Sequence, residues 1–176
     1  MEDTVSKLPV VQAQLDDIEA LKKVRKKCIK ETYMPILTKE QVECLASQDP
    51  NPVNLERQIS KGTVYLFKDE SKDSLEGYAH MKFTPRSGDN GVCTLEGIYP
   101  SKKALEDGIL EKNLEAIEEI IKDSGCYKIK GVATKPEMEL LRKFGYSESA
   151  PSYRHTRDGV TINYFPFSKT LFFPEM

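Results

Sequence analysis

The chain has 176 residues, with 26 Lys or Arg against 28 Asp or Glu, which gives a formal net charge of −2. This length fits a single domain over residues 1–176, large enough to bury a core without a metal or disulfide staple. The balanced charge argues against a dedicated nucleic-acid-binding protein, and no apolar run approaches the ~20 residues of a membrane span.

The N-terminal part of the chain is predicted to form a short strand and two helices. The strand covers Leu8–Gln12, and the first helix covers Asp16–Thr32. Thr38 is expected to open the second helix, because Gln41 follows three residues later as in a capping box. The stretch 48–54 holds two prolines and two asparagines, which predicts a loop. In the first helix, four side chains recur at steps of three and four residues: Ile18, Leu21, Arg25 and Cys28.

From Gly62 onward the hydrophobic pattern changes to that of strands. Strands are predicted over Thr63–Lys68, Gly77–Phe83 and Val92–Tyr99, with the first two joined as a hairpin and a loop at Pro85–Asn90. The longest helix follows and ends at Ser124-Gly125. Its apolar stripe consists of Leu110, Leu114, Ile117 and Ile121.

The last third of the chain adds a strand at Tyr127–Ala133, a helix at Pro136–Phe144, and a hairpin of Ser152–Thr156 with Val160–Leu171. The complete order predicts a mixed α/β (α+β) single domain. The aromatic-rich segment 165–173 is expected to be a core strand followed by a tail packed on the domain. A contact between two copies of the chain through this last strand, giving a homodimer, is the alternative.

The cysteines and histidines do not predict a metal site. The chain has only two histidines, and its four cysteines are scattered singly, so free thiols in a reducing compartment are expected. The N-terminus, Met-Glu-Asp-Thr, is acidic and polar, unlike the start of a secretory signal. We therefore expect a cytoplasmic protein. The four cysteines are Cys28, Cys44, Cys93 and Cys126.

Three local patterns resemble those of the GCN5-related N-acetyltransferase (GNAT) superfamily. Gly77-Tyr78-Ala79 is similar to its "vG-x-a" strand, 95–100 to its splayed strand L-E-x-x-Y-V, and 141–146 to its signature Y-E-K-x-G-F. The element order is also that of the family. The resemblance implies a central mixed, mostly antiparallel sheet with helices on both faces and a splayed central strand. It also implies transfer of acetyl from acetyl-CoA to a primary amine of a small molecule or peptide.

The resemblance further implies where acetyl-CoA binds, without a metal. The end of the splayed strand would hold the pantetheine arm through Ile98, Tyr99 and Ser101. The next loop would present backbone N–H groups at a helix N-terminus to the pyrophosphate, since such unsatisfied amides make an anion site. The residues implied in this second device are Lys102, Lys103, Gly108 and Ile109.

That loop departs from the family pattern Q/R-x-x-G-x-G/A, because only Gly108 matches it. Leu105 and Leu110 replace the first and last positions, and Glu106 and Asp107 place carboxylates beside the expected phosphates. Two like charges ~4 Å apart in partly wet surroundings repel by roughly 4 kcal/mol. The alternative function is therefore a non-catalytic GNAT-like interaction or sensing module that has lost normal CoA binding.

The chemistry requires a base, since a free alkylammonium has a pKa of ~10.4 and must lose a proton before it attacks. The resemblance implies Glu96 as this base, and a strand-surface carboxylate is the alternative. The family's acidic tyrosine is replaced by Leu141, so Tyr99 and Tyr127 are the possible substitutes. His80 is either a second candidate base or a structural histidine.

One charge cluster stands out, the basic run Lys22–Lys27 in the first helix. A solvated helix face is the expectation. The alternatives are binding of nucleic acid, an anionic membrane or an acidic partner, or a role as an import signal.

Overall fold

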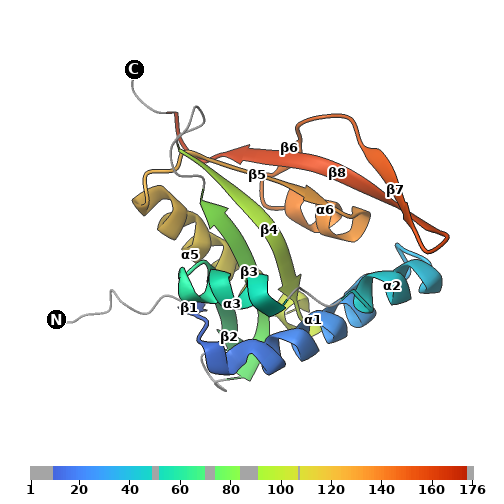
Figure 1. The fold of residues 1–176 in the computed structure, drawn as a ribbon. Helices are drawn as coiled ribbons and strands as arrows, with labels where there is room; N and C mark the ends of the chain where they lie inside the picture. The colour runs from blue at the N-terminus through green and yellow to red at the C-terminus, as the bar shows by residue number, and fades with distance from the viewer. Residues whose placement is uncertain (1–9, 49–51, 70–73, 84–90, 107, 174–176) are drawn as a thin grey trace.

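The structure is a computed structural model, and it describes residues 10–48, 52–69, 74–83, 91–106 and 108–173 (Figure 1). In these residues one eight-stranded sheet has the order β1-β2-β3-β4-β5-β8-β6, with β7 paired to β8. The strands are β1 (Val10–Gln12), β2 (Val64–Asp69), β3 (Ser74–Phe83), β4 (Val92–Pro100), β5 (Lys128–Ala133), β6 (Ser147–Glu148), β7 (Tyr153–Arg157) and β8 (Val160–Thr170).

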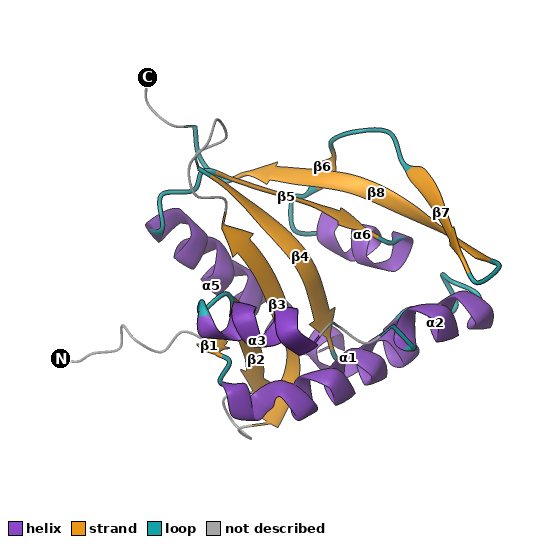
Figure 2. Cartoon of the chain, viewed as in Figure 1, coloured by secondary structure: helices purple, strands orange, loops and turns teal. Residues whose placement is uncertain are grey.

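The centre of the sheet is a parallel pair that opens along its length. β4 and β5 are parallel, whereas the other pairs of neighbours are antiparallel. Their pairing covers only Val92–Leu95 with 128–131. Beyond Leu95 the two strands diverge (Figure 2), which confirms the splayed central strand. The fold class, a mixed and mostly antiparallel sheet with helices, is confirmed as well.

The helices cover both faces of this sheet (Figure 1). Neighbouring residues of β2 point to opposite faces, as the two-residue period of a strand requires. Leu66 packs with Leu21 and Leu55 on one face, and Phe67 packs with the apolar stripe of the long helix on the other. The helices are η2 (Leu15–Asp17, a 3₁₀ turn), α1 (Ile18–Thr32), α2 (Lys39–Ala46), α3 (Pro52–Ser60), α4 (Lys102–Glu106), α5 (Ile109–Asp123) and α6 (Lys135–Arg142).

Two helices were not expected from the sequence. The predicted loop at 48–54 is wrong at its C-terminal end, because α3 begins at Pro52. Proline is tolerated at the first position of a helix, where a backbone N–H would have no partner within the helix. The short helix α4 precedes the predicted long helix, and its first turn is capped by Ser101. The capping box at Thr38 and Gln41 is confirmed. Residues 8–9, 49–51 and the predicted loop at 85–90 lie outside the described residues.

The remaining expectations concern single side chains. Cys28, Cys93 and Cys126 are buried and Cys44 is half-buried, and all four are free thiols as predicted. The prediction that the aromatic tail packs on the domain is wrong at Phe173, which is 88% exposed. In the described part of the chain, no helix is both long and apolar enough to span a membrane.

Candidate active site

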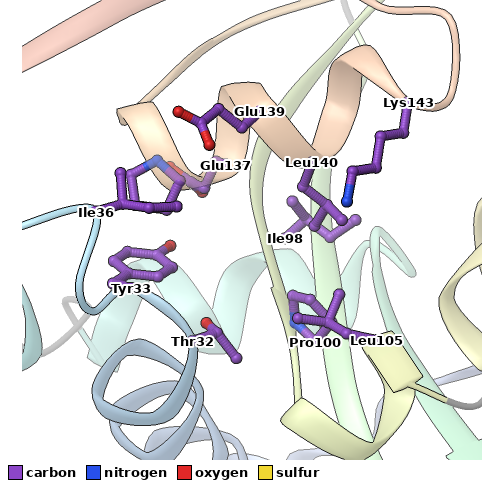
Figure 3. Close-up of a pocket in the computed structure, with 11 residues that line it drawn as sticks. Thr32, Tyr33, Ile36, Ile98, Pro100, Leu105, Glu137, Glu139, Leu140 and Lys143 are labelled. Atoms are coloured by element: carbon purple, nitrogen blue, oxygen red, sulfur yellow. The ribbon is translucent and has the colours of Figure 1, made fainter.

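A groove runs along the opening between β4 and β5. This central groove, about 170 Å³ in volume, is walled by the end of α1, the end of β4, α4 and α6 (Figure 3). Its apolar side is formed by Ile98, Pro100, Leu105 and Leu140. Figure 3 shows the phenol of Tyr33 directed toward α6 on the opposite side. The open strand pair thus provides a narrow, mostly apolar slot in the middle of the sheet.

Two further cavities continue the groove at its two ends. The inner cavity, about 180 Å³, is lined by Arg25, Glu96, Tyr99, Thr134 and Tyr164 among others, and it shares Tyr33 and Glu137 with the groove. The outer cavity, about 220 Å³, contains Gly108 and shares Leu105, Leu140 and Lys143 with the groove. Because neighbouring cavities share wall residues, the three lie side by side from Glu96 to the start of α5, and we call this row of cavities the track.

Glu96 is placed by an irregularity of the β3–β4 pair. His80 pairs with Gly97 and Met81 with Leu95, so Glu96 is the extra residue of a β-bulge. A bulge re-aims a side chain and is common beside active sites. The Glu96 side chain is 34% exposed, lies at the point where β4 leaves β5, and faces the inner cavity.

Glu96 has two polar neighbours. Gln58 Nε2 donates to Glu96 Oε1 at 3.3 Å, and His80 Nε2 lies 3.5 Å from the same oxygen. Burial lowers the pKa of His80, although the charge of Glu96 raises it, so the imidazole is neutral at pH 7. Glu96 also borders a side cavity of about 700 Å³ with Arg57 and Lys82 in its wall. The structure therefore brings together the two candidate bases of the sequence.

Arg25 is not part of a solvated face, so that expectation is wrong for this residue. Its Nη1 donates to the carbonyls of Leu45 at 3.3 Å and Gln48 at 2.6 Å. Its guanidinium lies 5.3 Å from the centre of the Tyr99 ring, which also packs on Tyr78 at 5.1 Å. The helical stripe that includes Arg25 was the sequence signal for this inward position. The neighbouring lysines favoured the opposite prediction, a solvated helix face.

Tyr33 and Glu137 were not expected as site residues. Glu137 Oε1 accepts hydrogen bonds from the backbone N and the Oγ1 of Thr134, both at 2.9 Å, and its carboxylate accepts another from the phenol of Tyr33. Burial raises the pKa of both groups, and the charge of Glu137 raises the pKa of Tyr33 further. The hydrogen bonds that Glu137 accepts lower its own pKa, and the charge of Arg25 lowers the pKa of both groups. Only the capping box at the start of α6 hints at this arrangement in the sequence.

The similarity of this chain to known proteins is found between structures and not between sequences. No protein-family model and no curated protein sequence matches the chain. A GCN5-related N-acetyltransferase from Rhodopseudomonas palustris matches with a TM-score of 0.74 at 14% identity, over 97% of this chain and 100% of its own. PaiA N-acetyltransferase from Thermoplasma acidophilum, in complex with coenzyme A, matches with a TM-score of 0.68 at 18% identity, over 92% and 97%.

A third solved structure agrees. YncA from Salmonella typhimurium, a putative acetyltransferase with its cofactor acetyl-CoA, has a TM-score of 0.68 at 12% identity, over 97% of this chain and 98% of its own. The chain has the GNAT fold. The fold implied by the three sequence patterns is thereby confirmed.

Within the GNAT fold, the residues expected at the pantetheine arm separate into three environments. Ile98 lines the central groove. Tyr99 lies in the inner cavity instead. The Ser101 hydroxyl donates to Glu76 Oε1 at 2.6 Å and accepts from the backbone N of Ala104 at 3.1 Å. The hydroxyl of Ser101 is thus engaged in capping α4, away from the groove.

The expected phosphate end of the GNAT fold is the start of α5. Gly108 is its N-cap in the left-handed region, with φ of 72°, and as a glycine it has no side chain with which to cap the first turn, which Ile109 begins. Leu110, which stands at the last position of the family pattern, is buried in the main core and also lines the outer cavity. Lys102 is exposed and Lys103 half-buried, both on α4, and Lys143 is the lysine found in the walls of the groove and the outer cavity.

The structure also locates the candidates for a proton-donating group. Leu141, at the family's tyrosine position, is buried in the core. Tyr127 precedes β5 at the paired end, where its backbone N donates to Gly91, and is therefore remote from the open end. No group of three or more His, Cys, Asp or Glu that could bind a metal occurs among the residues described.

Proposed function

We propose that this protein is an N-acetyltransferase that moves acetyl from acetyl-CoA to a primary amine of a small molecule or peptide. The observation that carries the proposal is the track of three cavities, with Glu96 at one end and the start of α5 at Gly108 at the other. Two neighbours of the same fold were solved with coenzyme A or acetyl-CoA, which supports this donor.

The chain's own residues fit such a donor. The apolar wall of Ile98, Pro100 and Leu140 suits a pantetheine arm. The N–H groups of the first turn of α5 and the ammonium of Lys143 suit phosphates, because both present positive charge. When bound, acetyl-CoA would supply the activated acetyl group as a thioester.

The acidic residues near this end are exposed. Glu106 lies outside the walls of the groove and the outer cavity, and its carboxylate can turn into water, where repulsion from a phosphate is weakened. Glu111 lines the outer cavity, so in the proposal its carboxylate turns away from the phosphates. Asp107 lies outside the described residues.

At the amine end, Glu96 would remove the proton from the attacking amine. His80, neutral and adjacent, would accept that proton in turn or hold Glu96 in position. The side cavity leads from Glu96 to a polar wall with Arg57 and Lys82, which gives the proton a route to solvent. The rings of Tyr99 and Tyr164 would pack against the acceptor in the inner cavity.

Calorimetry with coenzyme A tests the proposal. We expect saturable binding, a rise in melting temperature, and weaker binding by Leu105→Asp, because Leu105 lies in the walls of two cavities. Leu15→Asp is the matched control, since Leu15 is also an exposed leucine but lies outside the cavity walls. Absence of both binding and stabilisation would contradict the proposal and favour the non-catalytic module.

A transfer assay then tests the acceptor class. Thiol release from acetyl-CoA is followed with a polyamine, an amino acid and a short peptide as acceptors. Turnover with none of them, despite coenzyme A binding, would contradict the amine-acetylating activity.

A further inference from the structure

The side cavity that borders Glu96, about 700 Å³ in volume, is larger than the groove and either cavity at its ends. Its volume is typical of a site for a small molecule. It shares Glu96 with the inner cavity, where the proposed function places the amine, whereas none of its described wall residues lines the groove or the outer cavity. The side cavity therefore adjoins the acceptor and is separate from the expected donor site.

The wall of the side cavity is positively charged. It contains three cationic side chains against one carboxylate, that of Glu96, and the cations are Arg57, Lys61 and Lys82. Arg57 and Lys61 lie one turn apart at the end of α3, where the backbone N of Lys61 donates to the carbonyl of Arg57 at 3.0 Å. Lys82 is on β3, two residues after His80, and therefore on the same face of the strand. Two separate elements thus contribute positive charge to one cavity.

The three cations of this wall are exposed and unpaired. Within the described part of the chain, none of their side chains has an ion-pair or hydrogen-bond partner. The dipole of α3 favours a cation in its last turn and accounts for Arg57, but it does not account for Lys82 on a strand. Like charges that face one cavity repel one another, and an anion among them removes that repulsion. The side cavity therefore suits an anionic group.

Two buried polar atoms beside Glu96 are also unsatisfied. Gln58 Oε1 and His80 Nε2 have no hydrogen-bond partner among the described residues. Gln58 holds Glu96 through its Nε2 at 3.3 Å, which leaves its Oε1 facing no donor. A buried acceptor atom without a partner costs free energy, and the amine of a bound acceptor molecule would supply the missing donor. The polar end of the side cavity therefore suits an amine, and its outer wall suits an anion.

We propose, on the basis of the proposed function, that the acceptor is a small molecule with a primary amine and an anionic group, either a carboxylate or a phosphate. The amine lies at Glu96 and donates to Gln58 Oε1. The anionic group lies in the side cavity and is bound by Arg57, Lys61 and Lys82. The guanidinium of Arg57 suits either anion, because it can donate two parallel hydrogen bonds. A polyamine is a poor acceptor, because the same wall repels its second ammonium.

The test compares primary amines of equal length that differ only in their second group. The anionic amines are γ-aminobutyrate and phosphoethanolamine, the neutral one is aminobutanol, and the cationic one is diaminobutane. Thiol release from acetyl-CoA gives kcat/KM for each, and the corresponding hexane-chain amines cover a longer span. We expect the anionic amines to be favoured over aminobutanol by about tenfold, the equivalent of one charge-assisted hydrogen bond. The better of the two anionic amines identifies the anion as carboxylate or phosphate.

A charge reversal at Lys82 tests the position of the anion. Lys82→Glu should shift the ratio of kcat/KM between γ-aminobutyrate and diaminobutane by about tenfold toward the cationic amine. A gain for one amine with a loss for the other is not an effect that misfolding produces. Lys130→Glu, at an exposed position of β5 outside the walls of the side cavity and of the track, is the matched control and should keep the wild-type ratio.

The outcomes separate the two proposals. Equal acetylation of neutral or cationic amines, acetylation of an acidic peptide alone, or an unchanged ratio in Lys82→Glu would overturn the anionic acceptor and leave the acetyltransferase proposal intact. Calorimetric binding of the anionic amines that Lys82→Glu weakens, in a protein that does not bind coenzyme A, would support the anion site and overturn the acetyltransferase. Neither binding nor acetylation of any amine would overturn both.

Discussion

His80 Nε2 lies 3.5 Å from Glu96 Oε1, outside hydrogen-bond geometry, and has no hydrogen-bond partner among the described residues. The two side chains come from adjacent strands and meet because Glu96 is the extra residue of the bulge. A neutral, partly buried imidazole beside a carboxylate at the end of a cavity track is an arrangement suited to moving a proton.

Glu96→Gln should abolish most catalysis while leaving the donor bound. The amide keeps the shape of the carboxylate but cannot take a proton, so we expect kcat to fall by about 10²–10⁴. Calorimetry should give an unchanged affinity for coenzyme A, because Glu96 lies at the other end of the track. Full activity in this variant would shift the role of base to His80.

His80 should make folding stability depend on pH. Burial lowers its pKa in the native state, so the unfolded chain takes up the proton first, near pH 6.5, as the pH falls. Stability is therefore full above pH 6.5, declines as the pH falls from there to the lowered native pKa, and levels off below it. Urea unfolding at pH 7.5 and 5.0 should show a smaller loss for His80→Gln than for the wild type. His155→Gln, at an exposed position of β7, should behave like the wild type.

Asn113→Leu should stabilise the protein. Asn113 is fully buried in α5, and neither its Nδ2 nor its Oδ1 has a hydrogen-bond partner among the described residues. Removing a buried unsatisfied amide should gain about 1–3 kcal/mol in the free energy of unfolding, measured with urea. The same change at the exposed Asn163 of β8 should give no gain. A loss at position 113 would mean that the amide binds water or another group there.

Gly77→Ala should damage both folding and the groove. Gly77 has a φ of +144°, and a Cβ would lie 2.2 Å from the carbonyl oxygen of Tyr99 and 2.9 Å from Cα of Pro100. We expect a loss of about 3 kcal/mol, from overpacking and backbone strain together, and weaker coenzyme A binding because β4 must shift. Gly159→Ala, with φ of +78° and nothing near its Cβ, should cost only about 1–2 kcal/mol.

The cysteines should differ in reactivity. Burial raises the pKa of both Cys28 and Cys93 to about 12, so their thiolates are scarce and inaccessible. Alkylation of the native protein at pH 8, read by mass spectrometry, should modify the half-buried Cys44 first. Early modification of Cys28 would show that the packing of α1 against β4 opens readily.

The sequence predicted what local patterns determine. The stripe of α5 and the alternation of the strands follow from which faces are buried, so their positions were right within a few residues. α3 was missed because Pro52, read as a loop residue, is its first residue. The contact of Tyr33 with Glu137 could not be predicted. It depends on how α1 and α6 pack on the two sides of the slot, and the two residues are over 100 positions apart in the chain. Glu96 was found only because a resemblance drew attention to its strand.

The thiol of Cys28 has a mechanical consequence. Cys28 Sγ donates to the carbonyl of Pro100 at 2.6 Å, which ties α1 to the last residue of β4. The helix that carries Arg25 and the strand that carries Glu96 are therefore joined into one wall. The opposite wall, made by α6 and the free end of β5, has no such tie to β4 beyond Leu95 among the described strand pairs. The hydrogen bond from Tyr33 to Glu137 is the contact that joins α6 to α1 across the slot. Widening of the slot to admit a ligand should therefore break this hydrogen bond as α6 moves away from α1 and β4.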